Sequence, residues 1–405
     1  MKILHTSDLH IGKRLYDYDL IEDHKSFFNW LIQTISEWKI DYLLVTGDIF
    51  DQSNPSQDSL KLYYTFLAEL SKTGCQAIIT AGNHDSPALI DAPEDILSAL
   101  NIRVIGTIPE NIDELMIPIQ DSTGKVEAVI AAVPFLRDRD IRKAAEAESY
   151  DSRLEAVRDG ITRFYGALAN RMNEKYPDIP KIVTGHLYVQ GAQLSGSERE
   201  IQIGNLAGIE ETAFSEGINH FALGHLHKAQ DVDAAKRICY CGAPLPLSFA
   251  EREYENKIIL LTVEGGEIHQ EDIRVPQFRL LVEIRGTGAE VAKQLSDIEN
   301  PCDLAVLADI YITEDCFTPE AMQHKESLGN LYNNAADVAI VQSRIKFMNI
   351  LPATGNPSNH PEDFNALTPD KVFEEIIKPY NEEEKTALNE IFLEIKQTAE
   401  ERGKA

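Results

Sequence analysis

Five short polar segments, each next to a short apolar run, constrain this chain more than any other feature of its sequence. In chain order they are Asp8-Leu9-His10, Gly47-Asp48, Gly82-Asn83-His84-Asp85, Gly185-His186 and Gly224-His225-Leu226-His227. Carboxylates, imidazoles and amide oxygens bind divalent cations, and two such cations about 3.5–4 Å apart can hold the attacking and leaving oxygens of a phosphate ester in line. The five segments together therefore indicate one two-metal phosphoesterase site.

The apolar runs before four of these segments are predicted strands. YLLVT, AIIT, KIVT and HFAL are rich in β-branched and large apolar residues, as is typical of strands buried on both faces. The candidate ligands would then emerge at strand ends. In four segments a glycine precedes the candidate ligand. Because glycine has no Cβ, the backbone can turn sharply there and approach a bound group closely. For Asp8 and His10 we expect period two instead, which places both side chains on one face of a strand.

Any one segment alone is weak evidence, because a polar strand end is common. The ordered set DLH, GDIFD, GNHD, GH and GHLH, however, resembles the signature of the calcineurin-like metallophosphoesterases. The segments MKILHTSDLHIGKRL, GAQLSGSERE (191–200) and CGAPLPLSFAE (241–251) further resemble the SbcD family, the nuclease subunits of bacterial SbcC–SbcD DNA repair complexes. The resemblance is strong over residues 1–275 and general beyond them.

The resemblance implies two sets of metal ligands. The first ion would be held by Asp8, His10, Asp48 and His227, and the second by Asp48, Asn83, His186 and His225. The shared Asp48 would bridge, because its two oxygens can serve two cations. Manganese is the implied metal. Iron, zinc and magnesium stay open, because metal selectivity depends on geometry and supply.

The resemblance also implies a catalytic pair. His84 would face the scissile phosphate and protonate the leaving oxygen or stabilise developing charge, and Asp85 would orient and charge the His84 imidazole. One position departs from the family pattern: Asp51 stands where archaeal and eukaryotic relatives carry a histidine that helps to position substrate.

The net charge of −28 and the pI near 4.7 are the opposite of what a stand-alone DNA-binding protein shows. Contact with DNA must then come from local basic groups, the metals and a partner. We expect Lys13, Arg14 and Arg199 to contact substrate. For Arg137 and Arg139, a solvated loop is an equally good interpretation.

A chain of 405 residues exceeds the usual size of one hydrophobic core, so two or three domains are expected. The expected fold class is an α/β metallophosphoesterase β-sandwich flanked by helices, with a smaller α+β capping domain and a helical C-terminal tail. The predicted boundaries are 1–275 for the nuclease domain, 276–347 for the capping domain, 348–366 for a linker and 367–405 for the tail.

Periodicity predicts the main elements. Core helices are expected over Ile21–Trp38 and Gln57–Leu70, and capping-domain strands over 278–286, 304–312 and 336–347. In the tail, Leu388 and Phe392 belong to one apolar helix face. The resemblance favours docking of this face on an SbcC-type ATPase, although a helical pair folded onto its own domain is the alternative.

Five cysteines, an odd number in a long chain, indicate a reducing compartment without disulfides, and Cys239 and Cys241 are predicted to be structural. We expect a cytoplasmic protein, because neither a targeting segment nor a membrane span is visible. A homodimer is an expectation from the resemblance.

The sequence thus predicts a two-metal-dependent DNA nuclease, acting as exonuclease on duplex ends and endonuclease on hairpins or single strands together with an SbcC-type ATPase. A phosphomonoesterase or small-molecule phosphodiesterase is the first alternative, because the same ligand set serves several ester classes. The second is a DNA-end scaffold without catalysis. A scaffold of this kind would lack some of the metal-binding residues, whereas metal-binding residue types are present at all seven ligand positions.

Overall fold

The computed structural model describes most of the chain as far as residue 349. The described residues are 1–121, 123–137, 140, 150–194, 209–210, 217–232, 238–316, 328, 337–349, 373, 385, 388 and 392. Among them, no helix is both long and apolar enough to cross a membrane.

A first six-stranded sheet carries the order β14-β13-β1-β4-β5-β6. The strands β1, β4, β5 and β6 are parallel, with β6 at one edge, and β13 pairs antiparallel with both β1 and β14. The strands are β1 (Lys2–Thr6), β4 (Tyr42–Thr46), β5 (Gln76–Thr80), β6 (Ile102–Ile105), β13 (Lys257–Glu264) and β14 (Glu267–Arg274).

A second six-stranded sheet has the order β11-β12-β10-β9-β8-β7. Its four central strands are again parallel, and an antiparallel strand closes each edge. The strands are β7 (Met116–Gln120), β8 (Val126–Ala131), β9 (Lys181–His186), β10 (His220–Gly224), β11 (Gln230–Asp231) and β12 (Ile238–Tyr240).

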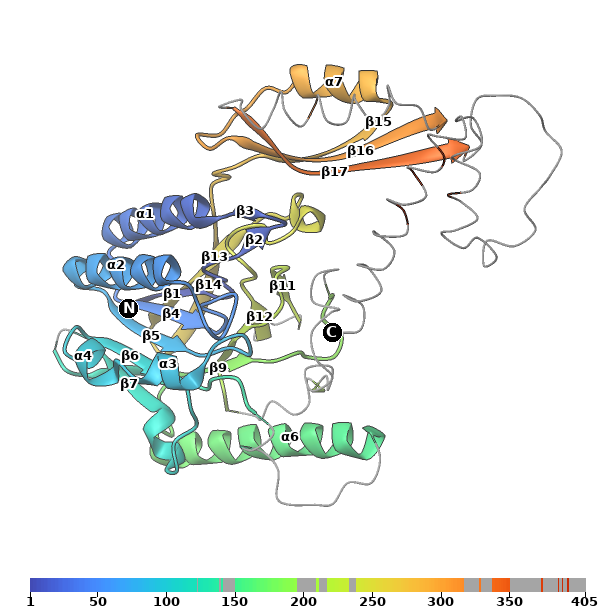
Figure 1. Cartoon of the computed structure of the whole chain (residues 1–405). Helices are drawn as coiled ribbons and strands as arrows, with labels where there is room; N and C mark the ends of the chain where they lie inside the picture. Colours follow the sequence, from blue (N-terminus) through green and yellow to red (C-terminus); the bar gives the residue numbers. More distant parts are fainter. Residues whose placement is uncertain are drawn as a thin grey trace. The chain divides into compact units, whose positions relative to one another are not determined.

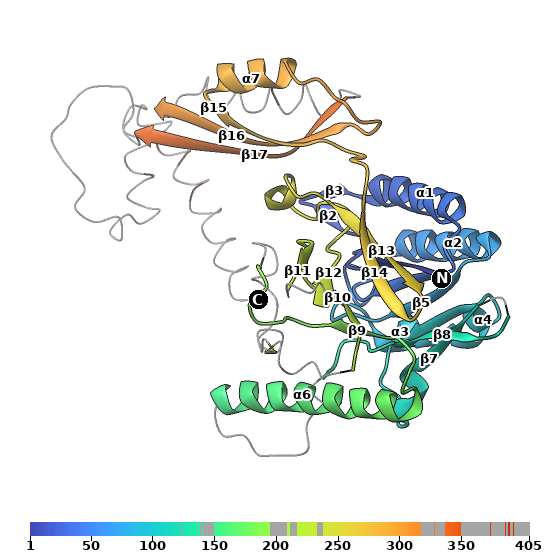
Figure 2. The same cartoon turned by 180° about the vertical axis from the view of Figure 1, so that it is seen from behind.

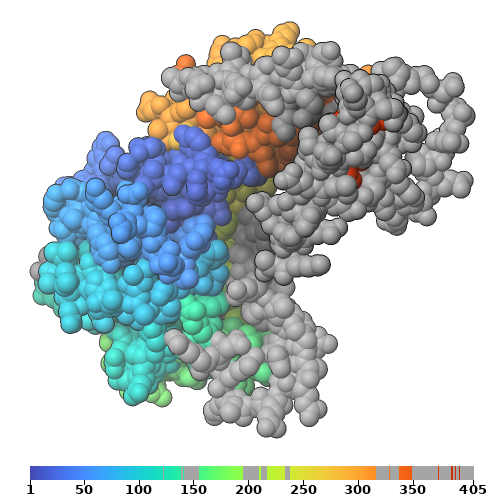
Figure 3. Space-filling model, in the orientation of Figure 1, coloured from blue at the N-terminus to red at the C-terminus, as the bar shows by residue number. Residues whose placement is uncertain are grey.

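The two sheets pack face to face and are covered by helices on their outer faces (Figure 1). Buried apolar residues of both sheets, including Ile3 and Ile130, form the core between them. The helices α1 (Ile21–Trp38) and α2 (Gln57–Thr73) pack on the first sheet, and α6 (Tyr150–Lys175) packs on the second. In the space-filling view of Figure 3, the blue atoms of the N-terminal part of the chain, which includes α1 and α2, form one continuous surface.

Short elements complete this part of the chain. They are the hairpin strands β2 (Arg14–Leu15) and β3 (Tyr18–Asp19), the helices α3 (Pro87–Asp91) and α4 (Glu94–Ser98), and the 3₁₀ turns η1 (Ile112–Leu115) and η5 (Phe249–Glu251).

A separate three-stranded sheet follows Val275. Its strands β15 (Leu281–Gly286), β16 (Val306–Cys316) and β17 (Val338–Asn349) are parallel. The helix α7 (Gly288–Ser296) covers one face of this sheet (Figure 2), and buried apolar residues of the helix and the strands form a separate core between them. A buried ion pair joins this sheet region to the first helix: the guanidinium of Arg279 contacts both carboxylate oxygens of Asp23, at 2.7 and 2.9 Å. The expected fold class, a helix-flanked β-sandwich with a smaller α+β unit, is confirmed.

The predicted helices and strands are found, with shifted ends. The helix over Ile21–Trp38 has the predicted bounds, and the second extends three residues further, to Thr73. That second helix begins after Ser56, whose hydroxyl accepts the N–H of Ser59. It ends at Thr73, and the next residue, Gly74, caps it with φ 82°.

The predicted domain boundaries stay predictions. The chain separates into two compact units, Met1–Ile350 and Leu351–Ala405. Most of the predicted linker and tail lies outside the described residues. Of the tail, four residues are described, all helical, and the Phe373 and Phe392 rings stack with centroids 4.0 Å apart.

Candidate metal centre

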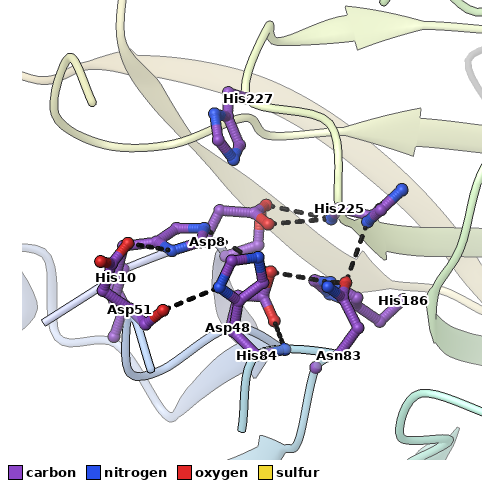
Figure 4. Close-up of polar contacts among 12 residues, drawn as sticks. Asp8, His10, Asp48, Asp51, Asn83, His84, His186, His225 and His227 are labelled. Carbon is purple, nitrogen blue, oxygen red and sulfur yellow. Dashed lines mark hydrogen bonds and ion pairs between the residues drawn. The ribbon is translucent and has the colours of Figure 1, made fainter. Parts of the chain in front are cut away.

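Both sheets supply side chains to one buried site at the carboxyl ends of their central strands (Figure 4). The first sheet contributes residues that follow β1, β4 and β5. The second contributes His186, the last residue of β9, and His225 and His227, which follow β10. All seven predicted ligands and His84 lie in this site: Asp8, His10, Asp48, Asn83, His84, His186, His225 and His227.

The prediction that Asp8 and His10 leave a strand by period two was wrong. Strand β1 ends at Thr6, and Asp8 and His10 instead adopt left-handed backbone conformations, with φ of 51° and 45°. Asp48 (φ 47°) and His225 (φ 99°) share this feature. Non-glycine residues rarely occupy this region, and such strain concentrates at functional sites. The two side chains converge because the chain turns after the strand.

Close approach, rather than a turn, explains two of the glycines. A Cβ on Gly224 would lie 1.9 Å from the carbonyl oxygen of Thr46, and one on Gly82 would lie 2.1 Å from Asp48 Oδ1. Neither has a positive φ. Gly224 thus lets the second sheet touch the first directly below the site.

Asp48 is the central acidic group. Its Oδ2 lies 3.5 Å from His10 Nε2 and 3.2 Å from His186 Nε2, and its Oδ1 accepts the main-chain N–H of His84 at 2.9 Å. Burial raises the pKa of a carboxyl group, but the interactions with His186, which include a hydrogen bond, and those with His10 and His84 hold the pKa of Asp48 well below its ordinary value. Asp48 is therefore a permanent carboxylate between two groups of potential ligands.

Asp8, His10 and His227 form the first group. One potential ligand atom from each lies within 4.8 Å of the others, and all three residues are buried. Burial raises the pKa of Asp8 to about 6 and lowers that of His10 to about 4. A neutral imidazole is the state that binds a metal ion. Nitrogen and oxygen donors at this spacing fit a divalent cation.

Asn83, His186 and His225 form the second group. Asn83 Oδ1 lies 3.0 Å from His186 Nε2 and 3.1 Å from His225 Nδ1. Burial lowers the pKa of His225 to about 3 and keeps its ring neutral. The outward Nδ1 of His186 lies 3.1 Å from the carbonyl oxygen of Thr46, which fixes the orientation of the ring. This set also fits a divalent cation.

His84 reaches the site from the same loop but has a different partner from the one expected. Its Nδ1 lies 2.8 Å from the main-chain oxygen of Asp51. The carboxylate of Asp85 instead accepts main-chain N–H groups of Ile49, Phe50 and Gly82. The expectation that Asp85 orients the His84 imidazole was therefore wrong: the buried Asp85 fixes the two loops that carry Asp48 and His84.

The predicted substrate contacts are distributed unevenly. Lys13 Nζ lies 3.2 Å from Asp51 Oδ1, beside the site, whereas the exposed Arg14 donates to the carbonyl of Asp17 in the β2–β3 hairpin. Arg199 and Arg139 lie outside the described residues. The guanidinium of Arg137 donates to the main-chain oxygen of Asp85 at 2.8 Å, which brings it close to the loop that carries His84.

Sequence reasoning missed the contacts that two carboxylates make with candidate ligands, although it had singled out Asp51 as a departure from the family pattern. Asp51 Oδ1 lies 3.3 Å from His10 Nδ1, and Glu251 Oε1 lies 3.0 Å from His227 Nδ1. Burial alone would raise the pKa of Asp51, but the interactions with His10 and Lys13 lower this pKa to about 2. The available signal for Glu251 was an acid at the end of the largely apolar segment PLPLSFAE.

Comparison with known proteins agrees with this geometry. The model of the calcineurin-like phosphoesterase family matches residues 1–229. The chain is 33% identical to the SbcD subunit of the SbcCD nuclease of Escherichia coli (strain K12), over 81% of this chain and 82% of that protein.

The SbcD subunits of two further bacteria are also similar. The Rhodobacter capsulatus protein is 30% identical over 92% of this chain and 93% of its own length. The Bacillus subtilis protein is 28% identical over 66% and 67%. The chain therefore belongs to the calcineurin-like phosphoesterases and, within them, to the SbcD family of nuclease subunits.

Proposed function

We propose that this chain is a two-metal-dependent DNA nuclease that cuts duplex ends as an exonuclease and hairpins or single strands as an endonuclease. One observation carries the proposal most directly: Asp48 lies among six further residues with nitrogen or oxygen ligand atoms from the two sheets, and His84 stands beside them. Membership of a nuclease family favours a phosphodiester substrate over other esters.

The proposed ligand sets follow the two groups of side chains. Asp8, His10, Asp48 and His227 would hold one divalent cation, and Asp48, Asn83, His186 and His225 the other. When bound, the two cations would supply the positive charge that holds the attacking and leaving oxygens of the ester in line. Manganese is the proposed metal because mixed imidazole and carboxylate ligation suits it and the family resemblance favours it.

The proposed catalytic residue is His84, which would donate a proton towards the leaving oxygen. A carbonyl oxygen only accepts hydrogen bonds, so the contact with Asp51 requires a hydrogen on Nδ1 of His84. Nε2 is then the ring nitrogen that would carry a second hydrogen and pass it to the leaving oxygen, after which the ring keeps the hydrogen on Nδ1. Asp85 acts as a positioning residue because its carboxylate ties the His84 loop to the loop after Asp48.

DNA and an SbcC-type ATPase are the proposed partners. The chain's net charge of −28 makes long-range attraction to DNA unfavourable, so a partner that delivers DNA suits it. Among the described basic residues, Lys13 contacts Asp51 and Arg137 contacts the main-chain oxygen of Asp85, and we propose both as phosphate contacts. Arg14 and Arg199 are kept as further proposed contacts. Docking of the ATPase on the C-terminal helices, a homodimer and a cytoplasmic location complete the proposal.

The direct test combines two substrates and two protein states. The purified chain would be incubated with Mn²⁺, alone and with an SbcC-type ATPase, on linear duplex DNA and on a chromogenic phosphomonoester. DNA digestion that disappears in His84→Gln supports the nuclease, and stimulation by ATP only with the partner supports docking. Turnover of the monoester with intact DNA would instead establish the phosphatase alternative.

A further inference from the structure

The outward nitrogen of His227 is held by a buried carboxylate. His227 Nδ1 lies 3.0 Å from Glu251 Oε1, and the two side chains are 6% and 1% exposed. The second oxygen, Oε2, accepts the main-chain N–H of Leu247 at 2.8 Å. A carboxylate offers only acceptors here, so Nδ1 of His227 carries the hydrogen and Nε2 is left to face the site.

The ring of His227 is thereby aimed at the first group of ligands. Figure 4 shows it directed towards Asp8, and it meets the His10 ring edge-on with centroids 5.1 Å apart. A carboxylate, a histidine and a metal ion in series is a common arrangement, in which the carboxylate fixes the tautomer and raises the basicity of the ligand.

Glu251 itself sits on a firmly held turn. It closes η5, whose Phe249 packs in a buried cluster with Leu15 and Leu20 of the hairpin region and Leu281 and Leu307 of the small sheet. The main-chain oxygen of Glu251 also accepts the N–H of Tyr254 at 2.9 Å. Because the turn is fixed from two sides, the carboxylate has little freedom to follow a displaced histidine.

We propose that Glu251 is a positioning residue that fixes the tautomer and orientation of His227 and thereby sets the affinity of the first of the two cation sites. This inference rests on the proposed function, because it takes His227 to be a ligand. It extends that function by adding to the site a residue from η5, outside both central sheets.

Glu251→Gln is the decisive variant. The His227 and Leu247 N–H groups meet different oxygens of Glu251, Oε1 and Oε2. In glutamine one of these positions becomes an NH2 group, so either the Leu247 contact is lost or the amide donates to His227 and reverses its tautomer. Mn²⁺ binding would be followed by isothermal titration calorimetry without DNA. We expect one of the two sites to weaken by about 10–100-fold while the other keeps its affinity.

Glu253→Gln is the matched control, because Glu253 lies two residues away with its side chain 81% exposed. It should bind both ions like the wild type. His227→Ala identifies which site is affected, and adding Glu251→Gln to it should change the affinity less than about twofold, since the carboxylate acts through the ring. Equal affinities in Glu251→Gln and Glu253→Gln, or fully additive losses in the double variant, would overturn the proposal.

A measurement on the wild-type chain covers the case in which Glu251→Gln does not fold. With ¹⁵N-labelled histidine and a chelator present, the His227 signals, identified by their loss in His227→Ala, should show a hydrogen on Nδ1. A ring protonated only at Nε2 would overturn the proposal. A wild-type chain that binds two ions but cuts no DNA would contradict the proposed function alone, because none of these measurements uses DNA.

Discussion

The Nδ1 atom of His84 lies 2.8 Å from the main-chain oxygen of Asp51, so the imidazole that faces the site is oriented by backbone and not by a carboxylate. The carbonyl oxygen can only accept, so this contact requires the hydrogen to be on Nδ1 of His84. Nε2 is then the ring nitrogen that is left to meet a substrate.

Replacing His84 by glutamine should separate metal binding from turnover. We expect His84→Gln to keep both ions and to lower the rate of DNA cleavage by about 10²–10⁴-fold, the usual contribution of a general acid. Metal content and cleavage rate would be measured on the same preparation. The control is His269→Gln, which alters an exposed histidine of β14 and should leave both quantities unchanged. A His84→Gln variant that loses an ion would assign this residue to ligation instead.

Removing Asp48 should empty both cation sites. Its Oδ2 lies within 3.5 Å of histidines from both ligand groups, so Asp48→Ala deletes a donor that the two sites share. We expect fewer than one ion per chain after dialysis against Mn²⁺, measured by elemental analysis, and no cleavage. Asp58→Ala, an exposed position on α2, should retain two ions. Two ions in Asp48→Ala would contradict the bridging role.

His5 should make the folded state sensitive to acid. Its ring is fully buried 2.9 Å from the Thr46 hydroxyl, and burial, assisted by His220, lowers its pKa to about 3. The unfolded chain therefore binds a proton at His5 first. The stability contributed by the neutral ring is complete above about pH 6.5 and falls by about 1.4 kcal/mol per pH unit as the pH drops towards 3.

Comparison with a variant that cannot titrate at position 5 separates the contribution of His5 from that of the other titratable groups. Between about pH 6 and pH 4, the free energy of unfolding of the wild type should approach that of His5→Gln with the stated slope, in urea titrations with a chelator present. The curve of His269→Gln should run parallel to the wild type. If the curve of His5→Gln also ran parallel to the wild type, the pKa of His5 would be the same in the folded and unfolded states, which would contradict the prediction.

The Asp23–Arg279 pair should be costly to break from one side. The side chains are 7% and 4% exposed, and Arg279→Met leaves the Asp23 carboxylate buried without its counter-charge. We expect a loss of about 3–5 kcal/mol in the free energy of unfolding, with partial recovery in the double variant Asp23→Leu/Arg279→Met. Arg285→Met, at an exposed position of β15, should have little effect. A double variant no better than the single one would contradict the argument.

The sequence predicted the strands and helices that surround the site because each carries a strong local pattern. YLLVT and HFAL are buried as β4 and β10, and the apolar face of Ile21–Trp38 packs on the first sheet. The ends of the capping strands were less accurate, since strand ends depend on pairing with a neighbouring strand. Pairing is not visible in a single segment.

The side-chain partners around the ligands could not be read from the sequence. Asp85 adjoins His84 in the chain but binds main-chain N–H groups, and Glu251 reaches His227 across 24 positions. Which acid meets which histidine depends on how loops fold back on the strands. The left-handed conformations of Asp8 and His10 were hidden for the same reason, because tertiary contacts impose them against local preference.

The division of the ligands between two sheets has a consequence during synthesis of the chain. Residues 1–100, which are made before the second sheet, contain Asp8, His10, Asp48, Asn83 and His84 but none of the three histidines that the second sheet supplies. His227 and its partner Glu251 emerge only after more than half of the chain has been made, followed by β13, which pairs with β1. A product that ends before His186 therefore lacks all three of these histidines, so neither of the two proposed ligand sets is complete in it.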